Sequence, residues 1–578
     1  MKNVKRGMSF RYRIMVIACC MALLISPGLS KSFGENSEVS SALKETLSWG
    51  ERIYREGILP SGRPMFTSVT GGIAAPGTTF ACASCHLRSG LGALDENVYS
   101  PPVNGKKLFS PRYAIYNGIE QIKAPPLRPA YTDETLKEVL VSGKDPTGRV
   151  LNDIMPRYIL EDKDANVLIQ YLKSLSSQFS PGVTDTSLRF ATVVTDDVSP
   201  EERDAMIGPL ESYCNLLDRQ IKYFKNPRYA RSQKMVEIML GSKELARRNI
   251  LLSIWTLKGP SETWRAQLEE YNRKEPVFAL LGGIAKGSWK PIHQFCEDYR
   301  IPCLFPNTDF PVISETDWYT LYLSKGYYQE GEGAARYLNS RNTLVNGKAI
   351  VEIVRDSDEG RALSAGFQQT WRDLGQQAPV TITLPPGKIL DKNLLSEVLS
   401  AQKPAVLIIW DNINALPALE SIAGDKRKPE LIFVSARYLG NNIWTIKEQI
   451  RDITYVTYPF SFSPYVPKAV MGGTKTSSDP RITLRQADMP LKNNSQKISQ
   501  LTDALTRQLP YWLAAMKGNY YRDYLLDVIG TMMPKEYPLY GQISFGPLQR
   551  FAAAGCYIVQ LSPGDKPELI KKSNWEIH

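Results

Sequence analysis

Cys82-Ala83-Ser84-Cys85-His86 stands in the first fifth of the chain. Its pattern, C-x-x-C-H, is the one through which c-type haem is attached covalently. Two thiols one helical turn apart can each add to a haem vinyl group, and the adjacent imidazole then lies under the iron as the proximal ligand. C-x-x-C by itself is also typical of a redox dithiol. The rest of the sequence has to separate these two interpretations.

Histidine is scarce in this chain, which has only three: His86, His293 and His578. This scarcity excludes multihaem sites, zinc sites of the H-E-x-x-H kind and a haem ligated by two nearby histidines. A haem held by His86 therefore needs a different second axial ligand, and methionine is the usual one. Between residues 40 and 178 the chain offers Met65 and Met155.

Met155 is the stronger candidate for that ligand. It begins the stretch Met155-Pro156-Arg157-Tyr158, after an expected helix at 132–142 and before a second helix-like segment at 163–175. Met65 precedes the C-x-x-C-H motif in a turn-rich segment and is the weaker candidate. The alternative for Met155 is a methionine of the hydrophobic core.

The order of C-x-x-C-H, proline-rich loop, helix, M-P and closing helix resembles class I cytochrome c. The resemblance covers residues 40–178 and implies an all-α domain with one covalent haem c. Carried over by position, it implies the thioether anchors Cys82 and Cys85, the proximal ligand His86 and the distal ligand Met155. It also implies that the backbone carbonyl of Pro101 or Pro102 orients the proximal histidine, which fixes the tautomer of the imidazole.

The N-terminus predicts export. Residues 1–13 carry five cations and no acid, an apolar run follows at 14–25, and Ser26-Pro27-Gly28-Leu29-Ser30 comes next. This arrangement is typical of a secretory signal peptide over residues 1–30 and predicts a periplasmic protein. The alternative is an uncleaved membrane anchor, for which the run is short. Export agrees with the haem motif, because the family attaches its haem outside the cytoplasmic membrane.

Charge and length limit the partners and the number of domains. Removing the five cations of residues 1–30 lowers the formal charge from +11 to +6. No basic stripe with interleaved aromatic residues is present, so nucleic acid is not an expected partner. The remaining positive charge suits a solvated surface that meets an acidic redox partner. The length of 578 residues predicts about two to four domains.

A polar linker at 179–187 leads to a second region, 188–578, with a different pattern. Short apolar runs rich in β-branched residues alternate there with amphipathic segments of helical length. Strands are expected at 190–194, 250–255, 277–281, 302–305, 349–354, 380–384, 405–410, 431–434 and 454–458. Helices are expected at 261–272, 290–299, 330–340, 362–374 and 392–401. This alternation predicts parallel sheets covered on both faces, arranged as two α/β lobes.

Three stretches of this region carry a second resemblance. They are Val277-Phe278-Ala279-Leu280-Leu281-Gly282-Gly283, then Arg300 through Thr308, then Ile350 through Gly360. Their order and spacing resemble the type I periplasmic binding proteins, the family that includes branched-chain amino-acid receptors. The resemblance covers residues 188–460. It implies that a small molecule binds in the cleft between the lobes, at the carboxyl ends of the strands.

The loops at those strand ends supply the candidate ligand-binding residues. They are Lys286, Ser288, Trp289, Thr308, Asp309, Asp356 and Asp411. Amino-acid receptors of the family hold a carboxylate with small hydroxyl residues. Because Lys286 and Asp309 stand at the most comparable positions here, an amino-acid ligand is not assumed. The alternatives are ordinary solvated loops and, for Trp289, packing on the helix that follows.

Four cysteines remain outside the motif and the expected signal peptide: Cys214, Cys296, Cys303 and Cys556. An oxidising compartment allows up to two disulfides, in three possible pairings. Cys296 near a helix end and Cys303 on the next strand can meet, which favours Cys296–Cys303 together with Cys214–Cys556. Buried free thiols are the alternative.

These features predict an exported c-type cytochrome joined to a solute- or partner-binding module. With both axial positions filled, its haem is expected to transfer single electrons to or from a redox partner, for example a periplasmic dehydrogenase. The chain is then an electron carrier and binding protein rather than a catalyst. One alternative is a haem oxidoreductase or peroxidase with an open sixth site and its substrate in the inter-lobe cleft. Another is a redox-responsive solute receptor of an ABC-type transport system.

Overall fold

The chain divides into two compact units. The computed structural model describes residues 29–69, 72–95, 98–116, 119–120, 122, 125–225, 243–341, 347–462, 483–486, 493–531, 535–537, 539–546, 549–552 and 555–577. One unit comprises the residues up to Cys85 together with Val103–Leu175, and the other comprises His86–Pro102 and the residues from Ser176 onward. Except for its last two residues, the expected signal peptide lies outside the described part. Over that part, no helix has the length and apolar character needed to cross a membrane.

In the described part of the first unit, helices hold more residues than strands do. They are α1 (Leu29–Glu56), α2 (Cys82–His86, whose last residue begins the second unit), α3 (Gly105–Leu108), α4 (Asp133–Ser142) and α5 (Asp162–Ser174). Thr132 caps α4 by accepting from the Thr135 backbone N–H, and Gly143 ends it with a φ of 74°. Such caps satisfy backbone groups that the helix itself leaves unpaired. The two helices predicted here, 132–142 and 163–175, are therefore confirmed within a residue or two.

A small sheet also belongs to this unit, so the expected all-α description is not correct for it. Strands β1 (Phe66–Val69), β2 (Ile73–Pro76) and β7 (Arg157–Ile159) pair in the order β2-β1-β7, all antiparallel. Two-residue strands β5 (Ile115–Tyr116) and β6 (Ile119–Glu120) form a further pair. The three-stranded sheet joins the segment before the C-x-x-C-H motif to the residues just after Met155.

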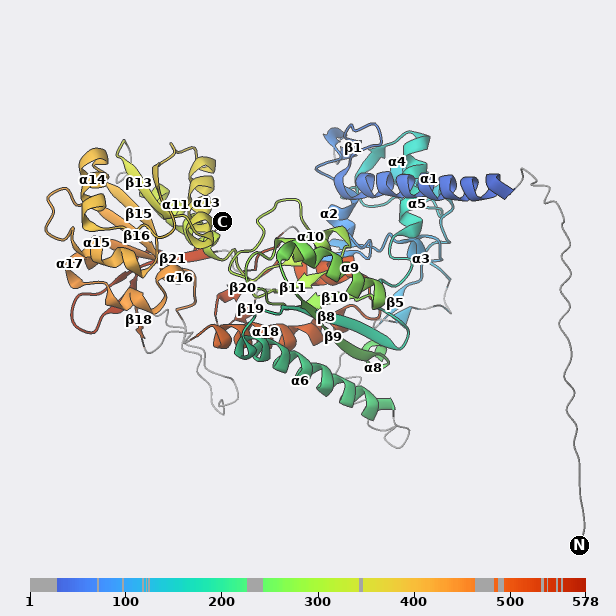
Figure 1. Ribbon diagram of the computed structural model, residues 1–578. Coiled ribbons are helices and arrows are strands. Elements are labelled where there is room, and N and C mark those ends of the chain that lie inside the picture. The colour runs from blue at the N-terminus through green and yellow to red at the C-terminus, as the bar shows by residue number, and fades with distance from the viewer. Residues whose placement is uncertain are drawn as a thin grey trace, which may run out of the picture. The chain divides into compact units, whose positions relative to one another are not determined.

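The second unit contains two separate sheets, which define two lobes (Figure 1). In the first lobe all strands are parallel, in the order β12-β11-β10-β8-β9. Their bounds are β8 Ser187–Thr195, β9 Asn249–Leu257, β10 Ala279–Leu281, β11 Cys303–Leu304 and β12 Thr320–Leu321. Strands β10 and β11 are buried throughout, as expected for a parallel sheet covered on both faces.

The second lobe has a parallel core with an antiparallel extension. The parallel strands are β13 (Ile350–Arg355), β14 (Val380–Leu384), β15 (Val406–Trp410), β16 (Leu431–Ser435) and β17 (Thr454–Tyr458). The antiparallel strands are β21 (Gly555–Leu561), β22 (Glu568–Lys571), β18 (Thr483–Arg485) and β23 (Glu576–Ile577). The predicted two-lobed α/β architecture with parallel sheets is confirmed, whereas the extension was not predicted.

Helices flank both sheets. In the first lobe they are α6 (Pro200–Lys225), α8 (Lys243–Ala246), α9 (Trp264–Lys274), α10 (Lys290–Asp298), α18 (Asn494–Ala515) and α19 (Arg522–Gly530), with the 3-10 turn η2 (Ser261–Thr263). In the second lobe they are α11 (Tyr327–Ser340), α13 (Asp358–Asp373), α14 (Lys392–Gln402), α15 (Leu416–Glu420), α16 (Ala436–Leu439) and α17 (Glu448–Arg451), with the 3-10 turns η3 (Ile413–Ala415) and η4 (Gly440–Thr445). Two hairpins complete the unit: β3 (Ala93–Asp95) with β4 (Val98–Ser100), and β19 (Lys535–Tyr537) with β20 (Gly541–Ile543).

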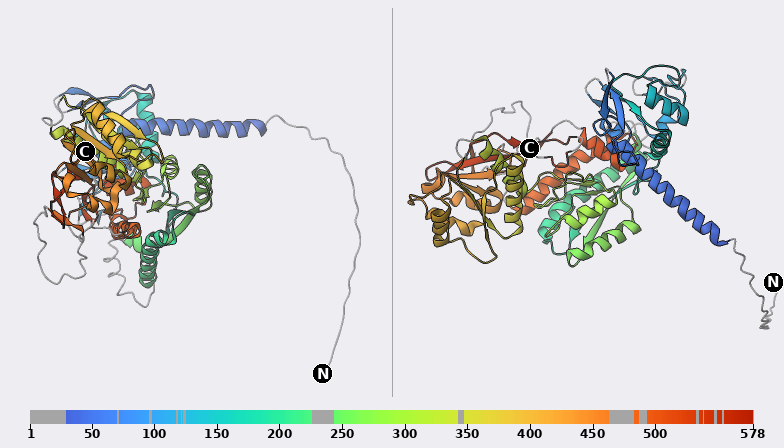
Figure 2. Two further views of the ribbon diagram at one scale, coloured as in Figure 1. Left: turned by 60° about the vertical axis from the view of Figure 1, so that its left-hand side comes forward. Right: turned by 90° about the horizontal axis from the view of Figure 1, so that it is seen from above.

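Helix α18 returns the chain from the second lobe to the first. It lies beside α6 (Figures 1 and 2). After it, the Arg522 guanidinium at the start of α19 donates to backbone carbonyls in the segments that precede β10 and β11, including Phe278 at 3.2 Å and Tyr299 at 3.0 Å. The part of the chain after residue 460 therefore contributes to both lobes: α18 and α19 to the first, and the antiparallel strands to the second.

Candidate functional site

Helix α2 is a single turn that holds the whole C-x-x-C-H motif. Cys82 is half-buried, Cys85 is exposed, and His86 is buried. The His86 Nδ1 lies 2.8 Å from the Pro101 carbonyl oxygen, which confirms the contact expected at Pro101 or Pro102. Because a carbonyl oxygen can only accept a hydrogen bond, Nδ1 must carry the proton. In the neutral imidazole, Nε2 is then the nitrogen with a free lone pair.

Met155 lies in a loop that is fixed by the residues around it. Its side chain is half-buried and packs against the same apolar cluster as Cys82. The Arg157 guanidinium donates to the Met155 carbonyl and, at 2.8 Å, to the Leu151 carbonyl. The Tyr158 hydroxyl donates to the Phe80 carbonyl at 3.1 Å, so the strand after Met155 is tied to the residue just before α2.

Met65, the other methionine considered, is fully buried in the core. Its backbone carbonyl accepts from the Gly77 N–H at 2.6 Å. The residues on α2 that could hold a haem are Cys82, Cys85 and His86, and Met155 as the second axial ligand stays a prediction. These residues suit the group, since the two thiols share one helical turn and the His86 imidazole is already oriented. In the described residues no cluster of three or more histidine, cysteine or acidic side chains could hold a bare metal ion.

A pocket of about 170 Å³ lies at the carboxyl ends of the first-lobe strands. Val198, Ile284 and Asn307 follow β8, β10 and β11 respectively, and all three line it. The N-terminal turn of α18 closes the pocket with Asn494, Lys497 and Ile498. Its walls combine cations, carboxylates, amides and apolar side chains, which is the mixture that small-molecule sites use.

Three of the predicted ligand-binding residues line this pocket: Lys286, Thr308 and Asp309. Lys286 is exposed, and it forms no ion pair within the described part of the chain. The Thr308 hydroxyl accepts from the Phe310 N–H at 3.0 Å and keeps its own proton for another acceptor. Asn307, which belongs to the same predicted strand-end loop as Thr308 and Asp309, also lines the pocket, and its Oδ1 is buried without a hydrogen-bond partner.

Asp309 is not an open carboxylate. It accepts a hydrogen bond from Lys497 Nζ at 2.6 Å and another from the Arg437 guanidinium of the second lobe. Burial alone would raise the pKa of Asp309, but Lys497 and Arg437 outweigh this and hold the pKa well below its usual range. The Asp309 carboxylate, predicted to bind a ligand, thus lines the pocket and is already paired with two of the chain's own cations.

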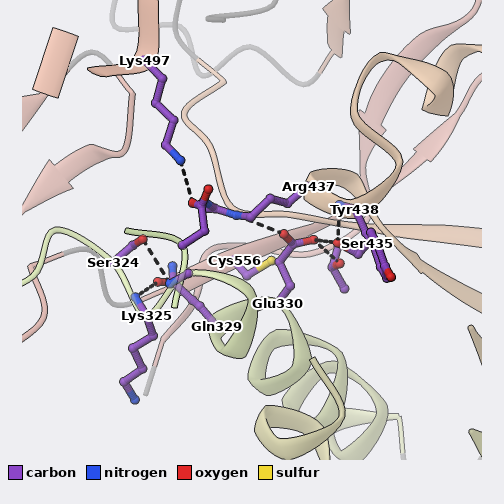
Figure 3. A network of polar contacts seen from close by, with 12 residues as sticks. Ser324, Lys325, Gln329, Glu330, Ser435, Arg437, Tyr438, Lys497 and Cys556 are labelled. Atoms are coloured by element: carbon purple, nitrogen blue, oxygen red, sulfur yellow. Dashed lines mark hydrogen bonds and ion pairs between the residues drawn. The ribbon is translucent and has the colours of Figure 1, made fainter. Parts of the chain in front are cut away.

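Arg437 continues this network into the core of the second lobe (Figure 3). Its Nε lies 3.5 Å from Glu330 Oε1, and both side chains are almost completely buried. The other oxygen of Glu330 accepts from Ser435 at 2.8 Å and from Thr457 at 2.7 Å. Burial raises the pKa of Glu330 despite these partners. The ion pairs thus connect the pocket of one lobe with the sheet of the other.

The remaining predicted ligand residues have structural roles. Trp289 is completely buried beneath Gly283, which confirms the packing alternative. Ser288 accepts from the Lys290 N–H at 3.2 Å at the start of α10. Asp411 is buried and binds the Arg355 guanidinium with both oxygens, at 2.8 and 2.7 Å. Asp356 lies half-exposed in an ion pair with Arg361. None of the four lines the pocket.

The four other cysteines are free, buried thiols in the structure. Cys296 and Cys303 adjoin each other, with their side chains in hydrogen-bond contact. Cys214 belongs to α6 of the first lobe, whereas Cys556 belongs to β21 of the second. The expected Cys296–Cys303 bridge has its partners side by side but is not formed. The expected Cys214–Cys556 bridge is not formed either, and its two cysteines are buried in different lobes.

Arg437 and Lys497 were not predicted as site residues. Arg437 lies close to the carboxyl end of β16, so the rule that selected the other loops could have found it. Lys497 lies beyond the span of the resemblance and carried no signal.

No protein-family model matches this sequence, and no curated protein matches it. Solved structures of ABC-transporter solute-binding proteins are similar to it. One from Rhodopseudomonas palustris BisB5, in complex with 3,4-dihydroxy benzoic acid, has a TM-score of 0.42 at 12% identity, covering 68% of this chain and 98% of that chain. A putative branched-chain amino acid ABC transporter from Rhodospirillum rubrum has a TM-score of 0.42 at 13% identity, covering 68% and 100%. A Thermus thermophilus branched chain amino acid ABC transporter with bound valine has a TM-score of 0.41 at 12% identity, covering 68% and 97%.

Proposed function

We propose that the region from Ser187 onward is a solute-binding module of the two-lobed periplasmic-receptor kind. The observation that carries this is the pocket at the carboxyl ends of β8, β10 and β11, lined by Lys286, Asn307 and Thr308. In open parallel α/β sheets this edge is where ligands bind. A cation, a buried amide oxygen without a partner and a hydroxyl with a free proton supply three directed contacts to a small polar molecule.

The chain's own residues also favour a receptor over a catalyst. No nucleophile with an adjacent base lines the pocket, and such a pair is what covalent catalysis needs. As part of this proposal the module acts outside the cytoplasm, because the basic and apolar N-terminal segments are typical of export. Delivery of a solute to an ABC-type transport system, with the haem domain as a redox-responsive partner, is the role that fits both units.

Thermal unfolding of the full chain against a panel of organic acids, amino acids, sugars and polyols tests this proposal. A ligand at 100 times its Kd stabilises the folded state by about 2.7 kcal/mol, which is readily measured. Lys286→Ala should weaken the effect of the stabilising solute, whereas Lys290→Ala, an exposed lysine on α10 outside the pocket, should not. If no solute stabilises the chain, or if both variants respond like the wild type, the pocket is not a binding site.

We also propose that α2 carries one covalent haem c, through thioethers at Cys82 and Cys85, with His86 and Met155 as axial ligands. The specific support is the 2.8 Å contact between His86 Nδ1 and the Pro101 carbonyl. It fixes the ring and directs Nε2 away from the carbonyl. Arg157 holds the Met155 loop in one conformation. Bound there, the iron would take up and release one electron at a time in exchange with a partner protein.

Absorption spectroscopy of the purified chain tests the haem assignment. Haem should remain attached after denaturation in the wild type but not in a Cys82→Ala, Cys85→Ala double variant. Met155→Ala should remove the methionine–iron charge-transfer band and permit carbon monoxide binding, whereas Met65→Leu should change neither. A chain without covalent haem would disprove the assignment. An intact band in Met155→Ala would disprove the role of Met155 and favour a different sixth ligand.

A further inference from the structure

The charge around Asp309 determines which chemical class can enter the pocket. The inference about the ligand class rests on the proposed solute-binding function and concerns the same site. Within the described residues, the cations that line the pocket are Lys286 and Lys497, and the carboxylates are Glu202 and Asp309. Not all four groups are available to bind a ligand, because Lys497 and Asp309 already bind each other.

Both carboxylates of the pocket are already satisfied by the protein. Asp309 binds Lys497 at 2.6 Å and also binds Arg437. Glu202 accepts from Ser199 at 3.1 Å and also from the amide of Asn494 on α18. An ammonium group arriving at Asp309 would therefore meet Lys497 and Arg437 at close range, and juxtaposed like charges disfavour binding.

Lys286 and Asn307 remain for a ligand. The Lys286 ammonium has no ion-pair partner among the described residues and suits a carboxylate. The Asn307 Oδ1 is buried without a hydrogen-bond partner, while its Nδ2 contacts only the Met206 sulfur, at 3.7 Å. A buried amide oxygen of this kind gains from a neutral donor such as a hydroxyl. Lys497 and Arg437 both bind the Asp309 carboxylate (Figure 3), so neither cation is left unpaired for a ligand.

We infer that the pocket takes a small hydroxycarboxylate and rejects the amino acid of the same shape. Lys497 and Arg437 act as the specificity-determining residues, because they fill the place that a ligand ammonium would need at Asp309. The two ligand classes differ at one atom, so the discrimination can be measured directly.

Titration calorimetry on the full chain with matched pairs tests this inference. The pairs are lactate with alanine, 2-hydroxyisocaproate with leucine and mandelate with phenylglycine. For any pair that binds, the hydroxy acid should bind more tightly, on the order of 100-fold, as expected when like charges are brought together. An amino acid that binds as tightly as its hydroxy acid would overturn the inference and leave solute binding intact. If no pair binds and the wider panel of solutes fails as well, the proposed function itself is wrong.

Three variants link the preference to Lys497. Lys497→Met removes one of the two cations at Asp309 and should reduce the preference for the hydroxy acid, by about tenfold or more. Lys497→Arg retains the charge and should retain the preference, which also shows that the fold accepts substitution there. Lys290→Met, outside the pocket, is the matched control. An unchanged preference in Lys497→Met would show that another feature sets the specificity.

Discussion

At the scale of single residues, Asp411 shows how a strand-end carboxylate can serve the fold instead of a ligand. Its position after β15 suggested a binding role, but it is 2% exposed and both its oxygens bind Arg355. Arg355 ends β13, and its Nη1 also donates to the Pro385 carbonyl at 3.1 Å. The pair therefore fixes two neighbouring strand ends of the second lobe.

Asp411→Ala should destabilise the chain by about 3–5 kcal/mol, because it leaves the buried Arg355 charge without its partner. Chemical denaturation measures this. Asp356→Ala, which removes a half-exposed partner of Arg361, should cost about 1 kcal/mol or less. Equal losses in the two variants would contradict the structural role given to Asp411.

Asp527 on α19 gives the protein a dependence on pH. It is 5% exposed and accepts from the Ser89 N–H at 2.9 Å. Burial raises its pKa to about 6 from an ordinary 3.8. The folded protein thus holds this proton up to a higher pH than the unfolded chain does. Protonation of Asp527 therefore stabilises the folded state. Its contribution to the free energy of unfolding is complete when the pH is below the ordinary pKa of 3.8, and it is lost as the pH rises through about 6.

Asp527→Asn should therefore be more stable than the wild type at pH 7, by roughly 3 kcal/mol. The two proteins should converge near pH 4. Denaturation over this pH range measures the difference, with Asp503→Asn, an ion-paired and half-exposed residue of α18, as the control. A constant difference between wild type and Asp527→Asn at all pH values would show that burial does not shift this group.

The sequence pattern identified some of the residues that line the pocket, but not all of them. Lys286 and Thr308 were found because they follow strands, and the same rule selected Asp356 and Asp411, which do not reach the pocket. Asp356 and Asp411 follow strands of the second lobe, whereas the pocket lies at the first-lobe sheet, where α18 closes it. This closure depends on contacts between distant segments, such as Asp309 with Lys497, and local pattern carries no information about them.

At the scale of elements, α11 and α13 pack closely because both have glycine at the crossing. A Cβ on Gly331 would lie 2.1 Å from the Leu363 carbonyl oxygen, and one on Gly366 would lie 2.0 Å from the Tyr328 carbonyl oxygen. Side chains other than hydrogen would push the helices apart. Since α11 carries Glu330, this contact also positions the network that reaches Asp309.

Gly366→Ala should destabilise the protein by about 1–3 kcal/mol, the usual cost of overpacking. Gly208→Ala, in α6, meets open space apart from its chain neighbours. Because Pro209 follows it and offsets the helix preference of alanine, it should change the stability by less than about 1 kcal/mol. Thermal unfolding of both variants gives the comparison. A neutral Gly366→Ala would mean that the two helices separate easily.

The elements of the α/β region could be predicted well from the sequence, and those of the first unit less well. Buried parallel strands are largely apolar runs, so Val406–Trp410 and Leu431–Ser435, which are buried throughout, lie within one residue of their predicted bounds. Strands β1 and β2 are short, mostly exposed and mixed in composition. Pairing with β7, about 90 residues further on, stabilises them, and tertiary pairing of this kind overrides local propensity.

At the scale of the whole molecule, two features define its chemistry: a C-x-x-C-H helix with an oriented histidine, and a two-lobed unit with a pocket at one sheet edge. The helical turn and the histidine contact of the first could be predicted, because the motif has a fixed local spacing, and the haem stays a prediction. The second could be predicted only as an architecture. Its pocket is closed by α18, whose place against the first lobe depends on packing with α6.

Hydrogen exchange of the full chain, with and without the solute that stabilises it most, tests the central claim most directly. The account predicts slower exchange in three segments that line the pocket: 284–287, 307–310 and the start of α18 at 494–498. Protection confined to other parts of the chain, or no protection at all, would contradict a solute site at the carboxyl edge of the first-lobe sheet.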